Sequence, residues 1–406
     1  MCLKYGKTPR LALKKLVGIK KIGTNSGFYR KSKKSEVLIN QAKVSHRYNY
    51  TANNPTYFID PTGEGDVAAH FYNEYLDSRA AGLNVVDSLI VGLGAVYPDK
   101  VDKFDAASLF IPSFNPFDKY SKDYVRKNNS GLHALTNSKV KYTVAAVDHF
   151  QNNLAKTIYH FAVSEHPGKD SGYHIPIDSL GDPEAMAFTE IAGHGFSEQH
   201  STDRNYVHPD KELQTSIMSM KRIYKFGVKT GRITEDDAAF KVRMEKRIKQ
   251  IQIKQTRLEE IYKAGHQITY CSIKEGFCGE KYTKNKHTIE FELLSKMFQE
   301  NTGGKFAEFK PEKIDVGKDF SEVLGVFDKK TLRVLNGLSE VPGWGEGLSE
   351  ELLIDALDTK FDLSAKYVRD SINNSIEKQI EREEATVIES SDDSGVKLKY
   401  DFGHID

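Results

Sequence analysis

The longest regular pattern in the sequence is an amphipathic helical repeat that begins at Thr234 and continues for about 30 residues. Thr234 is followed by three acidic residues, an arrangement typical of a capped helix start, because acidic side chains stabilise the positive end of the helix dipole. Apolar side chains recur on one face at Met244, Ile248, Ile251, Leu258 and Ile261. The pattern predicts a helix near 234–264, either pairing with a helix that ends near Gly227 or connecting two domains.

The other face of this helix is predicted to be densely basic. It carries Lys241, Arg243, Lys246, Arg247, Lys249, Lys254 and Arg257. The first 45 residues form a basic leader with no clear period. Basic surfaces of this kind contact phosphate backbones or acidic partners, although many are only solvated.

The rest of the chain is predicted to be mostly helical, with one small mixed region. Helices are expected over 66–81, over 85–96, from Asp182 to Ala192 and from Leu363 to Glu384. The apolar segment 85–96 favours a buried core helix, and a membrane-interacting hairpin is the alternative. Strands at Gln267–Ile273 and Lys305–Phe309, separated by a helix at Thr288–Glu300, predict an α+β region near 265–315. The fold class is therefore expected to be α+β and predominantly α-helical.

Shifts in composition and pattern divide the chain into six expected segments. These are the leader 1–45, an aromatic segment 46–64, a helical and loop region 65–232 with a histidine-rich part, a connecting helix 233–264, an α+β and helical domain 265–389, and a polar tail 390–406.

Composition places the chain among globular proteins and gives no transmembrane segment. It has 406 residues, 39% of them hydrophobic, and a net charge of +1, so overall charge favours no particular partner. Three cysteines do not make a disulfide framework, which favours folding in a reducing compartment. There is no apolar run of the ~20 residues that span a bilayer and no signal-peptide pattern. We expect a protein made in the cytoplasm without a signal peptide, and delivery outside the producing cell would need a carrier.

The segment 47–63 combines an aromatic strand with two turns at a distinctive spacing. Its fixed positions are Arg47, Tyr48, Tyr50, Asn53, Asn54, Pro55, Asp60, Pro61 and Gly63, with Phe58 as an intervening aromatic. Proline at 55 and the Asp-Pro-Thr-Gly sequence both predict turns. In these residues the chain resembles the end of the core of Rhs (YD-repeat) proteins.

The resemblance implies a functional class. In that family the segment marks the junction between a large β-cocoon and a variable C-terminal toxin. Residues 65–406 would then be a polymorphic effector domain, with a cognate immunity protein and a carrier as partners. The 46 residues before the motif contain no YD repeats, and Glu64 and Gly65 replace the bulky apolar residue that often follows it, so self-cleavage is not implied.

Histidine density is the strongest indication of chemistry. Eight of the 13 histidines lie between His133 and His208. Histidine serves both as a ligand for divalent metals and as an acid or base near neutral pH. The candidate catalytic or ligand residues are His160, His166, His194 and His200. The cofactor remains open, with a divalent metal as one possibility.

Three weaker candidates complete the set. Glu308 and Lys310 resemble the end of a PD-(D/E)xK nuclease motif but lack its preceding strand aspartate. A zinc site is conceivable at His266, Cys271, Cys278 and His287. ADP-ribosyl transfer stays open without assigned residues. The expected function is a toxin-class effector, hydrolytic on nucleic acid, and the alternative is a non-enzymatic assembly or interaction protein that contacts nucleic acid or an acidic partner.

Overall fold

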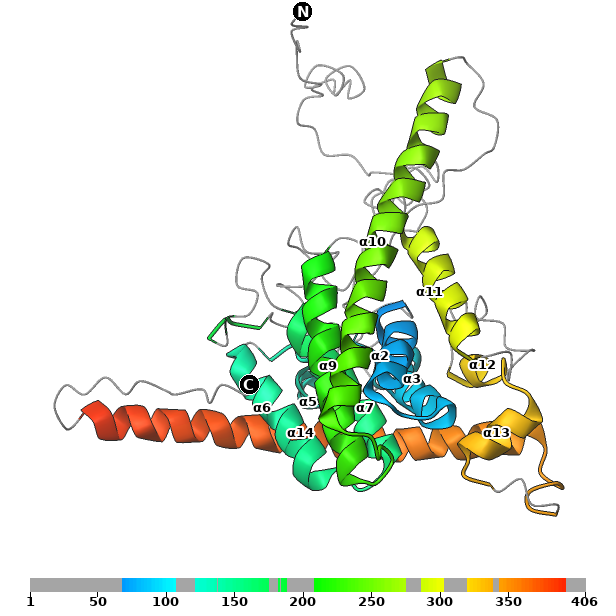
Figure 1. The fold of residues 1–406 in the computed structure, drawn as a ribbon. Coiled ribbons are helices and arrows are strands. Elements are labelled where there is room, and N and C mark those ends of the chain that lie inside the picture. The colour runs from blue at the N-terminus through cyan, green and yellow to red at the C-terminus, as the bar shows by residue number, and fades with distance from the viewer. Residues whose placement is uncertain are drawn as a thin grey trace, which may run out of the picture. The chain divides into compact units, whose positions relative to one another are not determined.

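Helices make up almost all of the described part of the chain (Figure 1). The computed structural model describes residues 68–106, 121–136, 138–174, 182, 184–187, 208–274, 286–302, 320–338 and 343–391. The elements are η3 (Ala68–Asn73), α2 (Glu74–Ala81), α3 (Val85–Lys100), α5 (Lys122–His133), α6 (Val140–His149), η5 (Phe150–Leu154), α7 (Ile158–Tyr173), α9 (Pro209–Lys229), α10 (Asp237–Lys274), α11 (Lys286–Thr302), α12 (Phe320–Leu324), α13 (Lys329–Leu335) and α14 (Glu350–Ser391).

The predicted β-structure is not found in these residues. Their only β-pairing is an isolated bridge between Lys139 and Met186, so the helical part of the fold prediction is confirmed and the α+β part is not supported. Gln267–Ile273 was predicted as a strand, but α10 continues through it, because extending an existing helix costs far less than starting a new element. The second predicted strand, Lys305–Phe309, lies outside the described residues.

Two other predicted helices have different outcomes. The helix Thr288–Glu300 is confirmed within α11. The prediction of a helix starting at Asp182 is wrong for Glu184–Ala187. These residues form a turn followed by Met186, which pairs with Lys139 in the isolated β-bridge. There the Asp182 carboxylate accepts from Glu184 N at 2.9 Å, closing a local turn in place of a helix cap.

Helices α3 and α7 pack against each other at the centre of the fold. A Cβ added to Gly94 of α3 would lie 2.4 Å from Ala162 Cβ of α7, so the two backbones approach as closely as glycine permits. The apolar segment 85–96 is thus a core helix, as predicted. No helix in the described part of the chain is long and apolar enough to cross a membrane.

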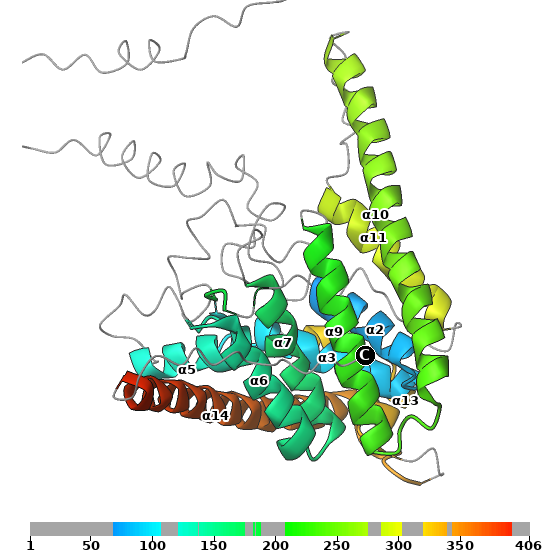
Figure 2. The same cartoon turned by 60° about the vertical axis from the view of Figure 1, so that its left-hand side comes forward.

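Helices α9 and α10 form the predicted hairpin (Figure 2). Gly231, with φ 69°, turns the chain between them. The Asp236 carboxylate accepts from Ala239 N at 2.9 Å and caps α10, two residues after the predicted cap Thr234.

The basic face of α10 is only partly exposed. Arg247 and Lys254, both predicted to face outward, are 1% and 3% exposed. Arg247 donates to Asp77 of α2 at 2.8 Å, and Lys254 donates to Glu212 of α9 at 2.6 Å. These two cations therefore hold helices together and are not available to an external partner.

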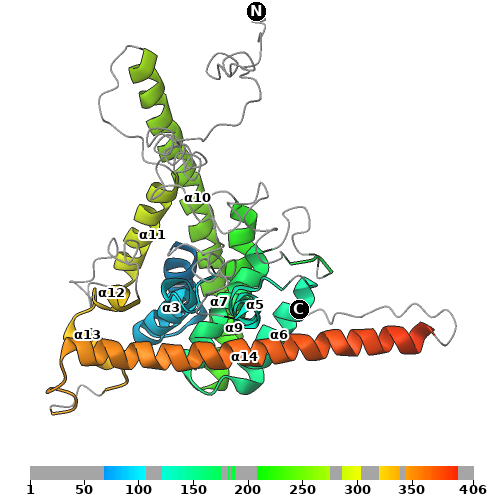
Figure 3. The same ribbon diagram turned by 180° about the vertical axis from the view of Figure 1, so that it is seen from behind.

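Helix α14 crosses several of the other helices (Figure 3). It packs against α5, α6, α7 and α13, and is longer at both ends than the predicted Leu363–Glu384. One hydrophobic cluster extends from Phe71 to Ile376, and Asp60–Asp406 forms a single compact unit. The finer boundaries predicted within this unit stay a prediction.

Candidate metal centre

Helix α7 is buried almost all the way round, although its sequence is rich in polar residues. His166, Asp170 and His174 are spaced by four residues and therefore share one face. All three are 0% exposed. Burying ionisable side chains costs free energy unless partners compensate, so we expect these three side chains to have polar or ionic partners within the core.

Three other helical elements bring matching side chains to the α7 face. His70 comes from η3, a turn of π-helix, a conformation frequently found at functional sites. Asp99 comes from the end of α3, and His133 from the last turn of α5. All three are buried, at 0%, 5% and 0% exposure.

The tautomers of two of these histidines are fixed by backbone carbonyl groups. His133 Nε2 lies 2.8 Å from the carbonyl oxygen of Phe104, and His166 Nδ1 lies 2.6 Å from that of Ala95. A carbonyl oxygen only accepts, so each of these nitrogens must donate. Such carbonyl contacts are the usual outer support of histidines that bind metal ions.

The proline at 98 helps to place the carbonyl that supports His166. Pro98 lies inside α3 and has no N–H to donate to the carbonyl of Gly94. The carbonyl of Gly94 therefore lacks its helical donor, and it lies next to Ala95, whose carbonyl oxygen accepts from the His166 ring.

The remaining nitrogens of the two rings face each other at short range. His133 Nδ1 and His166 Nε2 are 3.1 Å apart. Burial, together with the neighbouring His70 and His133 rings, lowers the pKa of His166 well below its usual value, so His166 is neutral and its Nε2 carries a lone pair. Two neutral rings held in these tautomers would oppose their lone pairs. A proton or a metal ion between them removes this conflict.

Two carboxylates complete the donor set. His166 Nε2 lies 3.3 Å from Asp99 Oδ1 and 3.3 Å from Asp170 Oδ2. His133 Nδ1 lies 3.6 Å and 3.8 Å from the same two oxygens. Zinc bonds of 2.0–2.1 Å in a tetrahedron place neighbouring donors about 3.3 Å apart, which is close to the 3.3–3.8 Å between these ring nitrogens and carboxylate oxygens.

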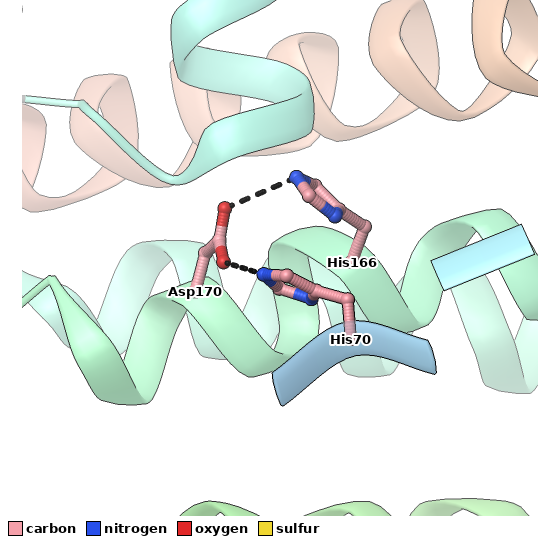
Figure 4. Close-up of side chains that lie close together, drawn as sticks. All are labelled: His70, His166 and Asp170. Carbon is pink, nitrogen blue, oxygen red and sulfur yellow. Dashed lines mark ion pairs between the residues drawn. The ribbon is translucent and has the colours of Figure 1, made fainter. Parts of the chain in front are cut away.

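His70 approaches the other oxygens of the same carboxylates. Its Nε2 lies 3.2 Å from Asp170 Oδ1 and 3.9 Å from Asp99 Oδ2. Figure 4 shows the two oxygens of Asp170 directed to different rings, one to His70 and one to His166. The His70 and His166 rings are themselves close, with centroids 4.3 Å apart.

The five residues define one centre. Two groups of three can hold an ion, His70 with His166 and Asp170, and Asp99 with His133 and His166. Both groups need His166, and one ring nitrogen binds one ion, so they describe alternative ligands of a single ion. These five donors are more than the four ligands that zinc requires, so one coordination position can be taken by water or substrate. Mixed imidazole and carboxylate donors suit zinc and similar transition ions.

A second buried network holds α7 from its other side. Ser219 Oγ of α9 lies 2.7 Å from both carboxyl oxygens of Glu74 and 2.9 Å from Glu165 Oε2. Arg222 donates to Glu165 from Nε at 3.1 Å and from Nη2 at 3.0 Å. Burial raises the pKa of Glu74 to about 8, and although burial also acts on Glu165, the Arg222 guanidinium brings the pKa of Glu165 below its usual value. Glu74 is therefore protonated at neutral pH beside an ionised Glu165.

Of the four histidines predicted from the sequence as site residues, only one lies in the centre among the residues that the structure describes. His166 belongs to the centre. His160 lies near the start of α7, half-buried against the Tyr367 ring at 4.8 Å, and takes no part in the centre. His194 and His200 lie outside the described residues, as do Glu308, Lys310 and Cys278.

Sequence reasoning missed His70, Asp99, His133 and Asp170 as site residues. The spacing His166-x₃-Asp170-x₃-His174 is a recognisable indication of donors on one helix face. No comparable spacing links the other donors, because they come from separate helices.

No protein-family model, no curated protein and no solved structure matches the chain.

Proposed function

We propose that this chain is a metal-dependent hydrolase, with an ion bound by side chains from the set His70, Asp99, His133, His166 and Asp170. The observation that carries the proposal is the 3.1 Å approach of His133 Nδ1 to His166 Nε2, with the opposite nitrogen of each ring donating to a backbone carbonyl. This arrangement presents two lone pairs to one point between two carboxylates.

The charge of the donor set favours a divalent cation. Asp99 and Asp170 bring two carboxylates into a buried space beside the ring nitrogens of the histidines. Separating such charges from water is costly without a partner, and a divalent ion neutralises both. A zinc-like ion in such a place lowers the pKa of a coordinated water to about 7 and polarises the bond under attack.

The protein groups then have distinct tasks. His133 and His166 are held rigidly by Phe104 and Ala95, which fixes the position of the ion. The two aspartates each have one oxygen toward the ion position and one toward His70. His70 is thereby placed to receive a proton passed through a carboxylate, which is the task of a general base.

The toxin-type resemblance of residues 47–63 supports an effector role, and the substrate class that we propose for it is a nucleic acid. Phosphodiester hydrolysis is a reaction that metal centres with carboxylate and imidazole donors perform. The chain would act as the hydrolytic effector of an Rhs-type system. Of the basic residues on α10, Arg247 and Lys254 are taken up by internal ion pairs and are not available to the partner of the alternative interaction protein, whereas Lys241, Lys246 and Lys249 are exposed.

The test begins with metal content and turnover of the full-length protein. Elemental analysis should find about one equivalent of a transition ion, and chelation followed by addition of Zn²⁺ or Mn²⁺ should remove and restore cleavage of RNA or DNA. Asp170→Asn should lose both ion and cleavage. Asp123→Asn, an exposed aspartate on α5, is the matched control and should keep both.

Two results would overturn the proposal. Protein without any bound ion after growth in metal-supplemented medium would remove the centre. A stoichiometric ion with no cleavage of RNA, single-stranded DNA or duplex DNA would make the centre structural. Expression of residues 65–406 in a bacterial host adds a second readout, since the proposal requires growth arrest with loss of nucleic acid and normal growth for Asp170→Asn.

A further inference from the structure

His174, the last residue on the buried polar face of α7, is not one of the donors of the metal centre. It follows Asp170 by four residues and is fully buried. Neither group of potential ligands includes it. Burying an imidazole costs free energy unless its nitrogens find partners, so the hydrogen bonds of this ring indicate its task.

The ring of His174 is bonded to the backbone of a ligand residue. Its Nδ1 lies 2.6 Å from the carbonyl oxygen of His133. A carbonyl oxygen only accepts, so Nδ1 is the donor. The ring of His133 carries one of the two nitrogens that meet at 3.1 Å in the centre. The contact therefore ties α7, which supplies His166 and Asp170, to the end of α5, which supplies the opposing nitrogen.

The geometry at the end of α5 explains why this carbonyl needs an outside donor. His133 is the last residue of the helix, and Ala134 follows it with φ 53°, in the left-handed region. The amide groups of Ala134 and Leu135 both turn back to the carbonyl oxygen of Asn129. The last carbonyls of a helix have no donor within it, and that of His133 is reached by His174.

The strained residue next to the ligand shows that the surroundings fix this segment. Ala134 is the only residue other than glycine with a positive φ in the described part of the chain. Such a conformation persists only where neighbouring contacts hold it, and it occurs preferentially where a functional group must be placed. The bond from His174 to the preceding carbonyl is one of these contacts.

His133 is thus held at two points. Its Nε2 donates to the carbonyl oxygen of Phe104 at 2.8 Å, which sets the direction of the ring. Its own carbonyl oxygen accepts from His174, which sets the position of its backbone relative to α7. Metal sites keep their ligand distances within about 0.2 Å, so a small shift of α5 against α7 would take His133 Nδ1 out of range.

We propose that His174 is a positioning residue of the metal centre, which holds the His133 ligand at the distance that ion binding requires; this rests on the metal-dependent function proposed above. The ordinary role of such a contact is a helix-end hydrogen bond that supports only the fold. The two roles differ in what they control. A positioning residue affects the affinity and coordination geometry of the ion, whereas a helix-end bond affects stability alone.

Three variants of the full-length protein separate these roles. His174→Phe keeps a flat ring and removes the donor. His174→Asn keeps a donor, because its amide nitrogen stands the same number of bonds from Cβ as the imidazole Nδ1. Lys360→Met is the matched control, because Lys360 of α14 donates to the carbonyl oxygen of Asn336 at the end of α13, at 2.7 Å, a helix-end bond that involves no donor of the centre.

Co²⁺ is the probe, because it takes the same nitrogen and oxygen ligands as zinc and its visible absorption depends on their number and arrangement. His174→Phe should weaken Co²⁺ binding about tenfold and change the absorption at saturation. His174→Asn should recover most of the affinity and the wild-type absorption. Lys360→Met should keep both, even where urea unfolding shows that it has lost as much stability as His174→Phe.

The possible failures are distinguishable. If wild type binds Co²⁺ and His174→Phe binds it equally well, or if His174→Asn binds no better than His174→Phe, His174 is only a helix-end support and the metal centre stands. If wild type binds no ion, the proposed function fails and His174 has no ligand to position. If circular dichroism shows that His174→Phe does not fold, His174→Gln replaces it, since its donor lies one bond farther from the backbone. His174→Gln must then bind Co²⁺ more weakly than His174→Asn, and equal affinities would overturn the positioning role.

Discussion

The effect of Asp170→Asn on stability distinguishes a metal centre from a structural ion-pair network, because it depends on added metal only in the first case. The Asp170 carboxylate lies 3.2 Å from His70 Nε2 and 3.3 Å from His166 Nε2 and is fully buried. If these contacts were structural ion pairs, breaking them would cost about 3–5 kcal/mol in any buffer. If they are ligand positions, the proton shared by the His133 and His166 rings in the metal-free protein balances only one of the two carboxylates, and asparagine at 170 removes the excess negative charge. We then expect a change below about 1 kcal/mol in chelator.

With metal present, wild type and Asp170→Asn should differ in stability. An ion at 100 times its Kd stabilises the wild-type fold by about 2.7 kcal/mol, and by roughly 3 °C in Tm for a chain of this size. If asparagine weakens binding by about 100-fold, the same ion concentration stabilises the variant by only about 0.4 kcal/mol. The Tm difference between wild type and variant should thus appear on adding Zn²⁺ and vanish in chelator.

The assay is thermal unfolding followed by circular dichroism, with chelator, with Zn²⁺ and with Mg²⁺ as a hard-ion comparison. Asp123→Asn should follow the wild type in all three conditions. A variant that is several kcal/mol less stable than wild type in chelator, with no response of either protein to Zn²⁺, would refute the reasoning and leave the cluster as an ion-pair network.

Three further predictions follow from the same contacts. Metal binding should release about one proton, because the metal-free rings of His133 and His166 need a proton between their nitrogens, which lie 3.1 Å apart. Calorimetry in buffers of different ionisation enthalpy measures the number of protons released, and zero release would contradict the assigned tautomers. Gly94→Ala should destabilise the fold by about 1–3 kcal/mol in urea unfolding, because the new Cβ would overlap Ala162, whereas Gly347→Ala has nothing within 4 Å and should be nearly neutral. The pKa of Glu74 is raised from 4.5 in the unfolded chain to about 8 in the folded protein, which contributes stability at low pH that is lost as the pH rises through about 8. The stability of the wild type relative to Glu74→Gln should therefore fall between pH 4.5 and pH 8. A pH-independent difference would contradict a protonated Glu74.

The helices could be predicted from the sequence because their patterns are local. The C-terminal stop of α2 at Gly82, with φ 114°, follows from glycine alone, and the hairpin of α9 and α10 follows from two amphipathic runs joined by a short turn. The strand predicted at Gln267–Ile273 failed because a short apolar run has no period of its own and followed the helix already under way.

The centre was predicted only in part, since its geometry depends on tertiary packing. Histidine density identified His166 correctly and also suggested His160. Six residues on a helix correspond to about 240° of rotation, which places these two rings on different faces. His70 depends on a turn of π-helix that no sequence pattern predicts, and the inward direction of Arg247 depends on Asp77, 170 positions away.

Helix α7 has no side that faces water over most of its length, and the centre is built on it. An ion seated there can neither enter nor leave without a local opening of the core, and the same opening must admit the phosphodiester, so ion exchange and turnover both depend on the rate of that opening. An enclosed ion would persist through dilution or brief chelation that strips an exposed site, and its removal and return would require prolonged incubation.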